Sequence, residues 1–242
     1  MISSDVYVSP EGKGGEGRIL LTGDTHGERG RFNPNSMSGE FEFCERDVLI
    51  VTGDWGYVFL DNFDERKYLD ELEEKPYTIA FVDGNHENFP ALRAYPEEIW
   101  CGGKIHRIRK NIIHLERGQV FNILGRTVFT MGGAYSIDRM MRRRGYSFWD
   151  EELPSDEEYK AAAENLRKCG MRVDIIVTHT APREIVRRMG YESAYEELEL
   201  EGFLEWIMYE VEFSDWYFGH FHIDRDIDEK FHALLFDVKE AR

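Results

Sequence analysis

The sequence predicts an α/β protein built from two stacked mixed sheets with helices on their outer faces. Short apolar runs that end at a glycine alternate with amphipathic helical stretches, which is typical of parallel β-strands joined by helices. The middle of the chain adds closely spaced strands that favour antiparallel pairing. The chain has 242 residues, 42% apolar and 32% charged, and we expect a single domain over residues 1–242.

The first half of the chain has the rhythm of a β-α-β unit. Buried strands are predicted over residues 18–22, 47–52 and 77–82. Between the last two, residues 61–75 form a charged helical stretch whose inward face would carry Tyr68, Leu69 and Leu72. Repeats of this length indicate a parallel sheet.

The second half starts with antiparallel strands over residues 111–131, with a turn at Leu124-Gly125. A helix is predicted to begin at the capping box of Ser155 and Glu158 and to end at Gly170. A second capping box, Ser193 and Glu196, would begin another helix. Its 3.6-residue spacing buries Leu200, Phe203, Leu204, Ile207 and Val211. Further strands are predicted over residues 173–178, 215–218 and 231–238.

Charge and composition limit the partners. The chain carries 30 basic and 47 acidic residues, a net charge of −17, which disfavours long nucleic acids but permits a small phosphorylated substrate where metal ions reverse the local sign. No apolar run approaches the ~20 residues of a membrane span. Cys44, Cys101 and Cys169 are far apart, and residues 1–17 lack an apolar signal segment. We therefore expect a cytoplasmic protein without a membrane partner. The glycine-rich residues 9–17 are interpreted as a flexible arm or loop.

Polar residues follow five predicted strands at the point where each strand ends. They are Asp24, His26, Asp54, Asn85, His86, His179, His220 and His222. Ligands of open α/β sheets bind at the carboxyl ends of the strands, so these side chains should converge in one crevice. In extended chain, residues i and i+2 point the same way, which predicts that Asp24 faces with His26 and His220 with His222.

The chemistry of these residues indicates a metal centre. Carboxylate, carboxamide and imidazole donors without a thiolate suit manganese, iron, zinc or nickel. Their number exceeds the need of one tetrahedral ion and fits two ions that share a ligand. A single such turn would be structural, whereas five in one chain indicate a site. His106, His114 and His232 lack this setting and are interpreted as structural.

The order and spacing of these blocks resemble the calcineurin-like metallophosphoesterase superfamily, in particular its small bacterial and phage members. The blocks read GDTHG at 23–27, GDWG at 53–56, GNHE at 84–87, THTAP at 178–182 and GHFH at 219–222. The resemblance implies a four-layer αββα sandwich and a metal-dependent phosphoric ester hydrolase.

The resemblance also implies roles for individual residues. Asp24, His26 and His222 would bind one ion. Asn85, His179 and His220 would bind the other, and Asp54 would bridge the two. His86 would be the catalytic general acid near the leaving group, with a structural histidine as the alternative. The cofactors would be two divalent or trivalent ions, with manganese as first choice.

The second block departs from the protein Ser/Thr phosphatase branch. The aspartate and arginine of its GDxxDRG pattern are replaced by Tyr57 and Val58, so a protein-phosphatase assignment is not favoured. Arginine forks match phosphate oxygens, and four arginines, Arg139, Arg142, Arg143 and Arg144, follow the Gly132-Gly133 loop. We predict Arg139 first, and Arg143, as substrate-binding residues. The alternative is a basic patch that pairs with acids at 150–152. Residues 135–168 are a candidate cap over the site.

These observations favour a dinuclear phosphoesterase that hydrolyses phosphate monoesters, diesters or both by in-line attack of a metal-bridging hydroxide. A nuclease of the same superfamily is one alternative, against which the acidic charge weighs. A metal-free protein-binding scaffold is another, although no ligand of the pattern has been lost. Monoester, cyclic nucleotide, dinucleoside polyphosphate and phosphoprotein substrates all stay open.

Overall fold

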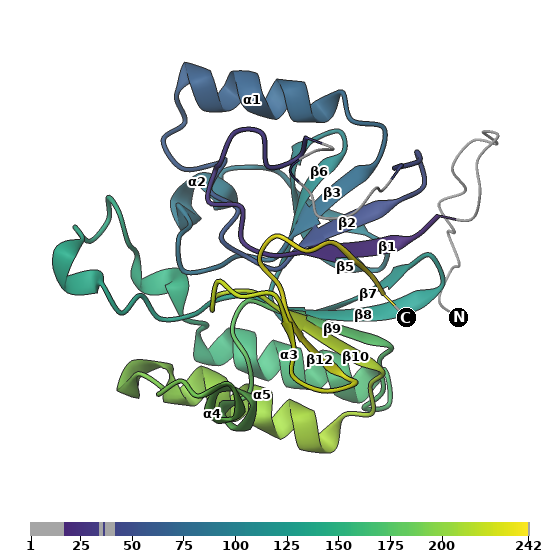
Figure 1. The fold of residues 1–242 in the computed structure, drawn as a ribbon, viewed down its shortest axis with the longest axis vertical. Coiled ribbons are helices and arrows are strands. Elements are labelled where there is room, and N and C mark those ends of the chain that lie inside the picture. The colour runs from purple at the N-terminus through teal and green to yellow at the C-terminus, as the bar shows by residue number, and fades with distance from the viewer. Residues whose placement is uncertain (1–16, 34–35, 37–41, 242) are drawn as a thin grey trace.

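The computed structural model describes residues 17–33, 36 and 42–241, so most of the glycine-rich arm expected at 9–17 lies outside the described residues. Within this part, two mixed sheets pack face to face and helices cover their outer faces (Figure 1). This arrangement confirms the predicted α/β fold of four layers, in the order helix, sheet, sheet, helix.

The first sheet has the strand order β13-β1-β2-β3-β6-β5-β4 within the described residues. Its strands are β1 (Ile19–Thr22), β2 (Val48–Val51), β3 (Thr78–Phe81), β4 (Glu97–Trp100), β5 (Gly103–Arg109), β6 (Ile112–Leu115) and β13 (Lys239–Glu240). The strands β1, β2, β3 and β6 are parallel, whereas β4, β5 and β13 join antiparallel at the two edges.

The second sheet has the order β11-β12-β10-β9-β8-β7 in the same part of the chain. Its strands are β7 (Gln119–Ile123), β8 (Arg126–Met131), β9 (Ile175–Thr178), β10 (Asp215–Phe218), β11 (Arg225–Asp226) and β12 (Phe231–Ala233). The strands β8, β9, β10 and β12 are parallel. The hairpin of β7 and β8 turns at Leu124 and Gly125, both with positive φ, as predicted.

One helical layer lies on each side of the sheets. The helices are α1 (Phe63–Glu73), α2 (Phe89–Arg93), α3 (Asp156–Lys168), α4 (Arg183–Met189) and α5 (Leu198–Glu210). Figure 1 shows α1 above the first sheet and α3, α4 and α5 below the second. Helix α1 buries Tyr68, Leu69 and Leu72 as predicted. Helix α3 begins with the predicted capping box of Ser155 and Glu158.

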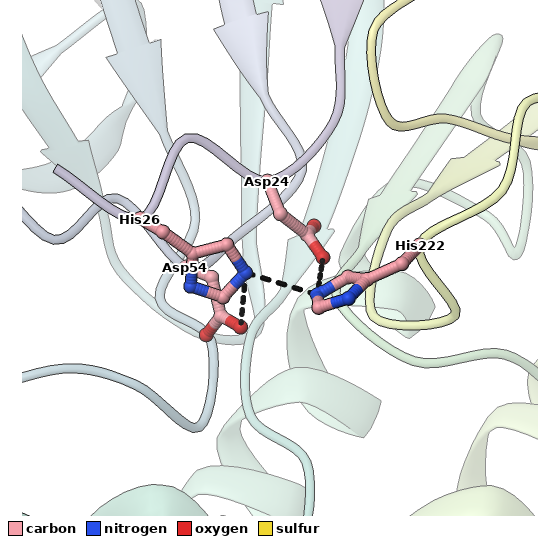
Figure 2. Close-up of side chains that lie close together, drawn as sticks. All are labelled: Asp24, His26, Asp54 and His222. Atoms are coloured by element: carbon pink, nitrogen blue, oxygen red, sulfur yellow. Dashed lines mark hydrogen bonds and ion pairs between the residues drawn. The ribbon is translucent and has the colours of Figure 1, made fainter. Parts of the chain in front are cut away.

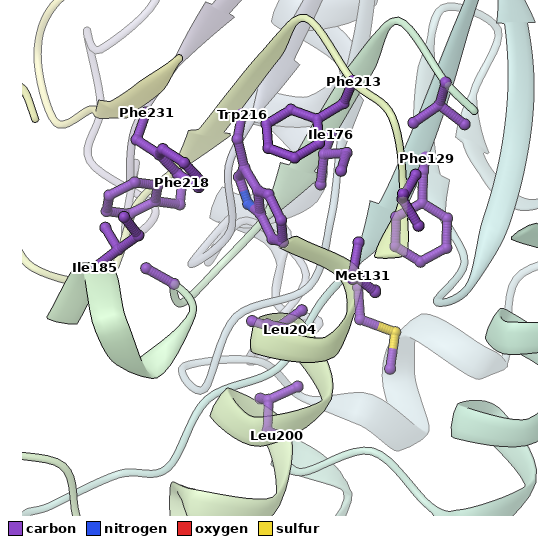
Figure 3. Close-up of a cluster of buried hydrophobic side chains, with 14 of the residues drawn as sticks. Phe129, Met131, Ile176, Ile185, Leu200, Leu204, Phe213, Trp216, Phe218 and Phe231 are labelled. Atoms are coloured by element: carbon purple, nitrogen blue, oxygen red, sulfur yellow. The ribbon is translucent and has the colours of Figure 1, made fainter. Parts of the chain in front are cut away.

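Three apolar clusters hold the four layers together. The first joins α1 to the first sheet, with Leu69 and Leu72 on Leu49 and Phe81. The second lies between the sheets and is formed by residues such as Ile50, Val82, Ile175 and Val177. The third joins the second sheet to α3, α4 and α5, where Trp216 and Phe129 face Leu200 and Leu204 (Figure 3). Because each strand is buried on both faces, the strands read as continuous apolar runs.

Three local predictions were wrong. Helix α5 begins at Leu198 without a side-chain cap, because a 3₁₀ turn at Tyr195–Glu197 precedes it, so Ser193 and Glu196 form no capping box. Residues 111–131 do not form one antiparallel unit: β6 is parallel to β3, and β7 opens the other sheet. The last predicted strand, residues 231–238, ends at Ala233.

The segment predicted as a cap, residues 135–168, has two different parts. Helix α3 packs on the second sheet, with Ala162 and Leu166 in its core. Before it, residues 135–152 form loops with short 3₁₀ turns at Arg139–Met141 and Asp150–Glu152, and this stretch extends beyond the sheets in Figure 1. The cap stays a prediction, and its candidate is now the loop part.

Candidate metal centre and active site

The predicted site residues lie where the carboxyl ends of the parallel strands of both sheets meet. Asp24 and His26 follow β1, Asp54 follows β2, and Asn85 with His86 follows β3. From the second sheet, His179 follows β9, and His220 with His222 follows β10. The face-to-face packing of the sheets brings these segments together although 198 positions separate Asp24 from His222 in sequence.

A first group of donors consists of Asp24, His26, Asp54 and His222 (Figure 2). One ligand atom from each of the four lies within 4.8 Å of the others. His26 Nε2 lies 2.9 Å from His222 Nε2, and His222 Nε2 lies 3.3 Å from Asp24 Oδ2. Two imidazole nitrogens and two carboxylates that face one point form a donor set suited to a divalent cation.

A second group consists of Asn85, His179 and His220. The Asn85 Oδ1 atom lies 3.0 Å from His179 Nε2 and 3.1 Å from His220 Nδ1. The other nitrogen of His179, Nδ1, lies 2.8 Å from the carbonyl oxygen of Thr52, so a donated hydrogen bond there leaves Nε2 as a free donor atom for an ion.

Asp54 lies between the two groups. Its Oδ2 atom is 3.6 Å from His26 Nε2, and its Oδ1 atom is 3.4 Å from His179 Nε2. The backbone amide of His86 donates to Oδ1 at 2.8 Å and fixes the carboxylate. A carboxylate with one oxygen toward each donor group has the orientation that a bridging ligand requires.

The backbone around the site is strained at the ligands themselves. His26, Asp54, His220 and His222 have φ values of 46°, 46°, 65° and 51°, a region that non-glycine residues rarely adopt. The chain thus leaves the extended conformation directly after each strand. His220 and His222 consequently do not face together, as the i, i+2 rule predicted; they belong to different donor groups.

The glycines before the ligands allow carboxylates from neighbouring strands to approach. A Cβ atom on Gly84 would lie 2.1 Å from Asp54 Oδ1, and one on Gly219 would lie 2.0 Å from Asp24 Oδ1. Such distances are impossible for real side chains. The glycine of each block therefore makes room for a ligand of the adjacent block.

The electrostatics of the site fit bound cations. Burial and the neighbouring His179 lower the pKa of His220 to about 3, which keeps its ring neutral and able to bind a metal. Burial alone would raise the pKa of Asp54, but His179, His86 and His26 hold it below its ordinary value. The anionic carboxylate and neutral imidazole are the protonation states of metal ligands, so these residues fit the ions that the sequence predicts.

His86 lies beside both groups without belonging to either. Its ring packs edge-on against His26, with 5.2 Å between ring centroids. Burial lowers the pKa of His86, and the Arg142 guanidinium lowers it further, whereas Asp54 opposes this shift. Arg142 Nη2 lies 2.8 Å from His86 Nδ1 and 2.9 Å from Nε2. The sequence pointed to the arginine cluster but not to Arg142 as the member that contacts the candidate acid.

The two arginines chosen from the sequence lie elsewhere. Arg139 Nε donates to Glu152 at 2.6 Å, and its guanidinium packs over the Tyr135 and Phe148 rings. Arg143 is exposed and lies over the Tyr146 ring. Neither has a contact with the two donor groups among the interactions of the described residues, so their substrate-binding role stays a prediction.

Arg139 nevertheless connects to the metal ligand Asn85 through buried side chains. Asn85 Nδ2 donates to Ser136 Oγ at 3.0 Å, and Ser136 Oγ donates to Glu152 Oε2 at 2.9 Å. Glu152 is fully buried and also accepts from the Ser136 amide. This chain fixes the orientation of the Asn85 amide so that its oxygen faces His179 and His220.

Two further buried glutamates support the site and carried no signal in the sequence. Glu87 accepts from the Trp55 amide at 2.6 Å and so holds the turn after Asp54. Glu197 Oε1 lies 4.0 Å from His220 Nε2, and burial together with Glu201 raises the pKa of Glu197 to about 7. Glu197 is one of many acidic residues in the chain, and its place beside His220 depends on how the turn before α5 folds.

Tyr57 and Val58, which replace the phosphatase-branch aspartate and arginine, are structural here. Tyr57 is buried and its hydroxyl donates to the carbonyl oxygen of Glu28 at 2.5 Å, and Val58 belongs to the core between α1 and the first sheet. Neither residue contacts His86 among the printed interactions of the described chain, whereas Arg142 does.

The fold and the clustered carboxylates and imidazoles define a metal-dependent hydrolase. The model of the calcineurin-like phosphoesterase family matches residues 17–224, and the chain belongs to this family. Among solved structures, a phosphopantetheinyl hydrolase from Mycobacterium tuberculosis is similar, with 17% identity, a TM-score of 0.49, and coverage of 91% of this chain and 90% of that chain. No curated protein sequence matches the chain. None of the helices in residues 17–33, 36 and 42–241 has the length and apolar character of a membrane span.

Proposed function

We propose that this chain is a two-metal phosphoesterase that hydrolyses small phosphate monoesters, diesters or both. The observation that carries the proposal is the position of Asp54, whose two carboxylate oxygens face two different groups of donors. Two divalent ions held there would supply an activated water and would offset charge on the phosphoryl oxygens. Manganese is the first choice, since the donor set contains only oxygen and nitrogen atoms.

The residues of the chain then have separate tasks. Asp24, His26 and His222 would hold one ion, and Asn85, His179 and His220 the other. The water oxygen bonds to phosphorus while the ester P–O bond breaks, the water loses a proton, and the leaving oxygen takes a proton to become an alcohol. We propose His86 as the donor of that proton, because it adjoins both groups and belongs to neither.

Arg142 is the arginine we propose to contact the phosphoryl group. It lies against His86, so its guanidinium is within one side chain of the donor groups. Arginine binds phosphate oxygens through charge-assisted hydrogen bonds. Arg139 and Arg143 then support the loop that carries Arg142. The expected cytoplasmic location is supported by the three cysteines, which are all free.

Metal stoichiometry tests the proposal. Purified protein loaded with manganese should contain two ions per chain and hydrolyse nitrophenyl phosphate or bis(nitrophenyl) phosphate. Asp54→Ala should remove at least one ion and nearly all activity. The control is Asp215→Asn, which changes another buried aspartate at the opposite end of β10 and should keep both ions. Two ions and full turnover in Asp54→Ala would refute the proposal.

A further inference from the structure

A cavity of about 570 Å³ begins at the candidate active site and runs along the first sheet. His26 and His86 form its inner end, and the turns after β1 and β2 form its sides. Its far end reaches the first turn of α1, near Asn62 and Asp64. A volume of this size is in the range that encloses a small organic ligand.

The walls of the cavity are mostly apolar. Tyr57, Phe59, Leu60 and Tyr68 line it. The Tyr57 hydroxyl donates to a backbone carbonyl, and the Tyr68 hydroxyl accepts from the Gly30 amide, so both phenols already have polar partners. The Leu60 side chain is 63% exposed beside the cavity. These surfaces offer contact area to a ligand rather than additional hydrogen bonds.

The charges that line the cavity do not favour an anion. Arg29 is the single cationic residue among its lining residues in the described chain, and it lies 3.8 Å from the Asp64 carboxylate. Glu65 is the second acid, and it accepts from the backbone amides of Leu60 and Asp61. A second phosphate placed here would meet two carboxylates and one arginine that is already paired.

We propose that this cavity binds the leaving-group side of the substrate, and that the leaving group is an uncharged organic alcohol with an apolar, ring-sized body. The inference rests on the proposed function. A general acid must lie within hydrogen-bond distance of the leaving oxygen, and His86 forms the inner wall, so the group attached to that oxygen extends into the cavity. This selects against dinucleoside polyphosphates, whose leaving group carries further phosphate.

The first test varies the size of the leaving group at nearly constant acidity. The manganese-loaded enzyme should hydrolyse 2-naphthyl phosphate with a kcat/KM about 10-fold above that of phenyl phosphate, since the extra ring removes apolar surface from water. Leu60→Ser and Phe59→Ala should reduce this preference toward unity and change phenyl phosphate hydrolysis less than about 3-fold. Ile99→Ser, which changes an exposed residue on β4 outside the cavity, should keep the preference.

The second test varies the charge of the leaving group. An aryl phosphate with a ring carboxylate should have a kcat/KM about 10-fold below that of its carboxamide analogue, and Asp64→Asn should narrow this difference. Equal kcat/KM values for the two sizes, or a preference that Leu60→Ser leaves intact, would overturn the cavity assignment alone. Failure to hydrolyse any of these esters would overturn the proposed function and the assignment together.

Discussion

A buried ion pair directly behind the site gives the sharpest stability prediction. Arg117 donates to Asp83 Oδ2 through Nε at 2.8 Å and through Nη2 at 2.5 Å, and the side chains are only 4% and 2% exposed. His114 Nε2 lies 3.2 Å from Asp83 Oδ1. Asp83→Asn removes the negative charge and leaves the Arg117 guanidinium buried without its main partner. We expect the free energy of unfolding to fall by about 3–5 kcal/mol.

The surroundings of Arg117 support this magnitude. Its Nη1 atom has no hydrogen-bond partner among the described residues, and the next carboxylate, Glu158, lies 3.6 Å away and is 30% exposed. Glu158 therefore offsets only part of the loss. Urea denaturation at pH 7 measures the change. As a matched control, Glu212→Gln breaks an ion pair whose side chains are both 71% exposed and should cost less than about 1 kcal/mol.

The pH dependence gives an independent check of the same pair. Burial would raise the pKa of Asp83, but Arg117 and His114 hold it well below its ordinary value in the folded protein. A depressed folded-state pKa adds stability that is complete above the unfolded pKa, about 3.9, and is lost as the pH falls below it. The stability difference between wild type and Asp83→Asn should thus shrink between about pH 5 and pH 3. A difference below about 1 kcal/mol at pH 7, or one independent of pH, would refute the reasoning.

Two further predictions concern catalysis. His86→Asn should keep both ions and lower kcat by roughly 10²–10⁴ for alkyl phosphates, with a smaller loss for nitrophenyl phosphate, whose leaving group needs less protonation; equal losses would argue against an acid role. Arg142→Ala should lower kcat/KM about 10- to 150-fold at unchanged metal content, more for monoesters than for diesters, because a charge-assisted hydrogen bond of about 1.5–3 kcal/mol is lost. Arg144→Ala, at a position paired with Asp150 on the surface, is the control, and equal effects of the two changes would contradict the prediction.

The layers of the fold could be predicted because each buried strand and helix carries its own periodic pattern. The run over residues 47–52 is apolar throughout, and β2 is buried on both faces. Helix α1 alternates charged and apolar residues, and its buried set was predicted in full. The edge hairpin of β4 and β5 was not predicted. Its strands are rich in charged residues, with Glu97 and Lys104 paired across the edge, and such a pattern does not distinguish a strand from a loop.

The candidate site was predictable as a set but not in its detail. Parallel strands place their carboxyl ends at one edge, and this alone gathers Asp24, Asp54 and Asn85. Which arginine reaches His86 depends on the loop conformation of residues 135–152, which has no periodic pattern. Arg142 lies three positions from the predicted Arg139, and the difference arises because Glu152 holds Arg139. Buried supporting residues such as Glu152 depend on the same loops.

The strained turns explain why the donor atoms divide into two groups. Had the chain stayed extended after β10, His220 and His222 would point to one side and compete for one ion. With φ near 65° and 51° the backbone turns sharply, so that His220 faces Asn85 while His222 faces Asp24. Each left-handed residue costs of the order of 1–3 kcal/mol. Backbone amides offset part of this cost, since the His220 amide donates to Asp24 at 3.0 Å. The same hydrogen bond that holds the strained turn therefore also orients a ligand of the other group.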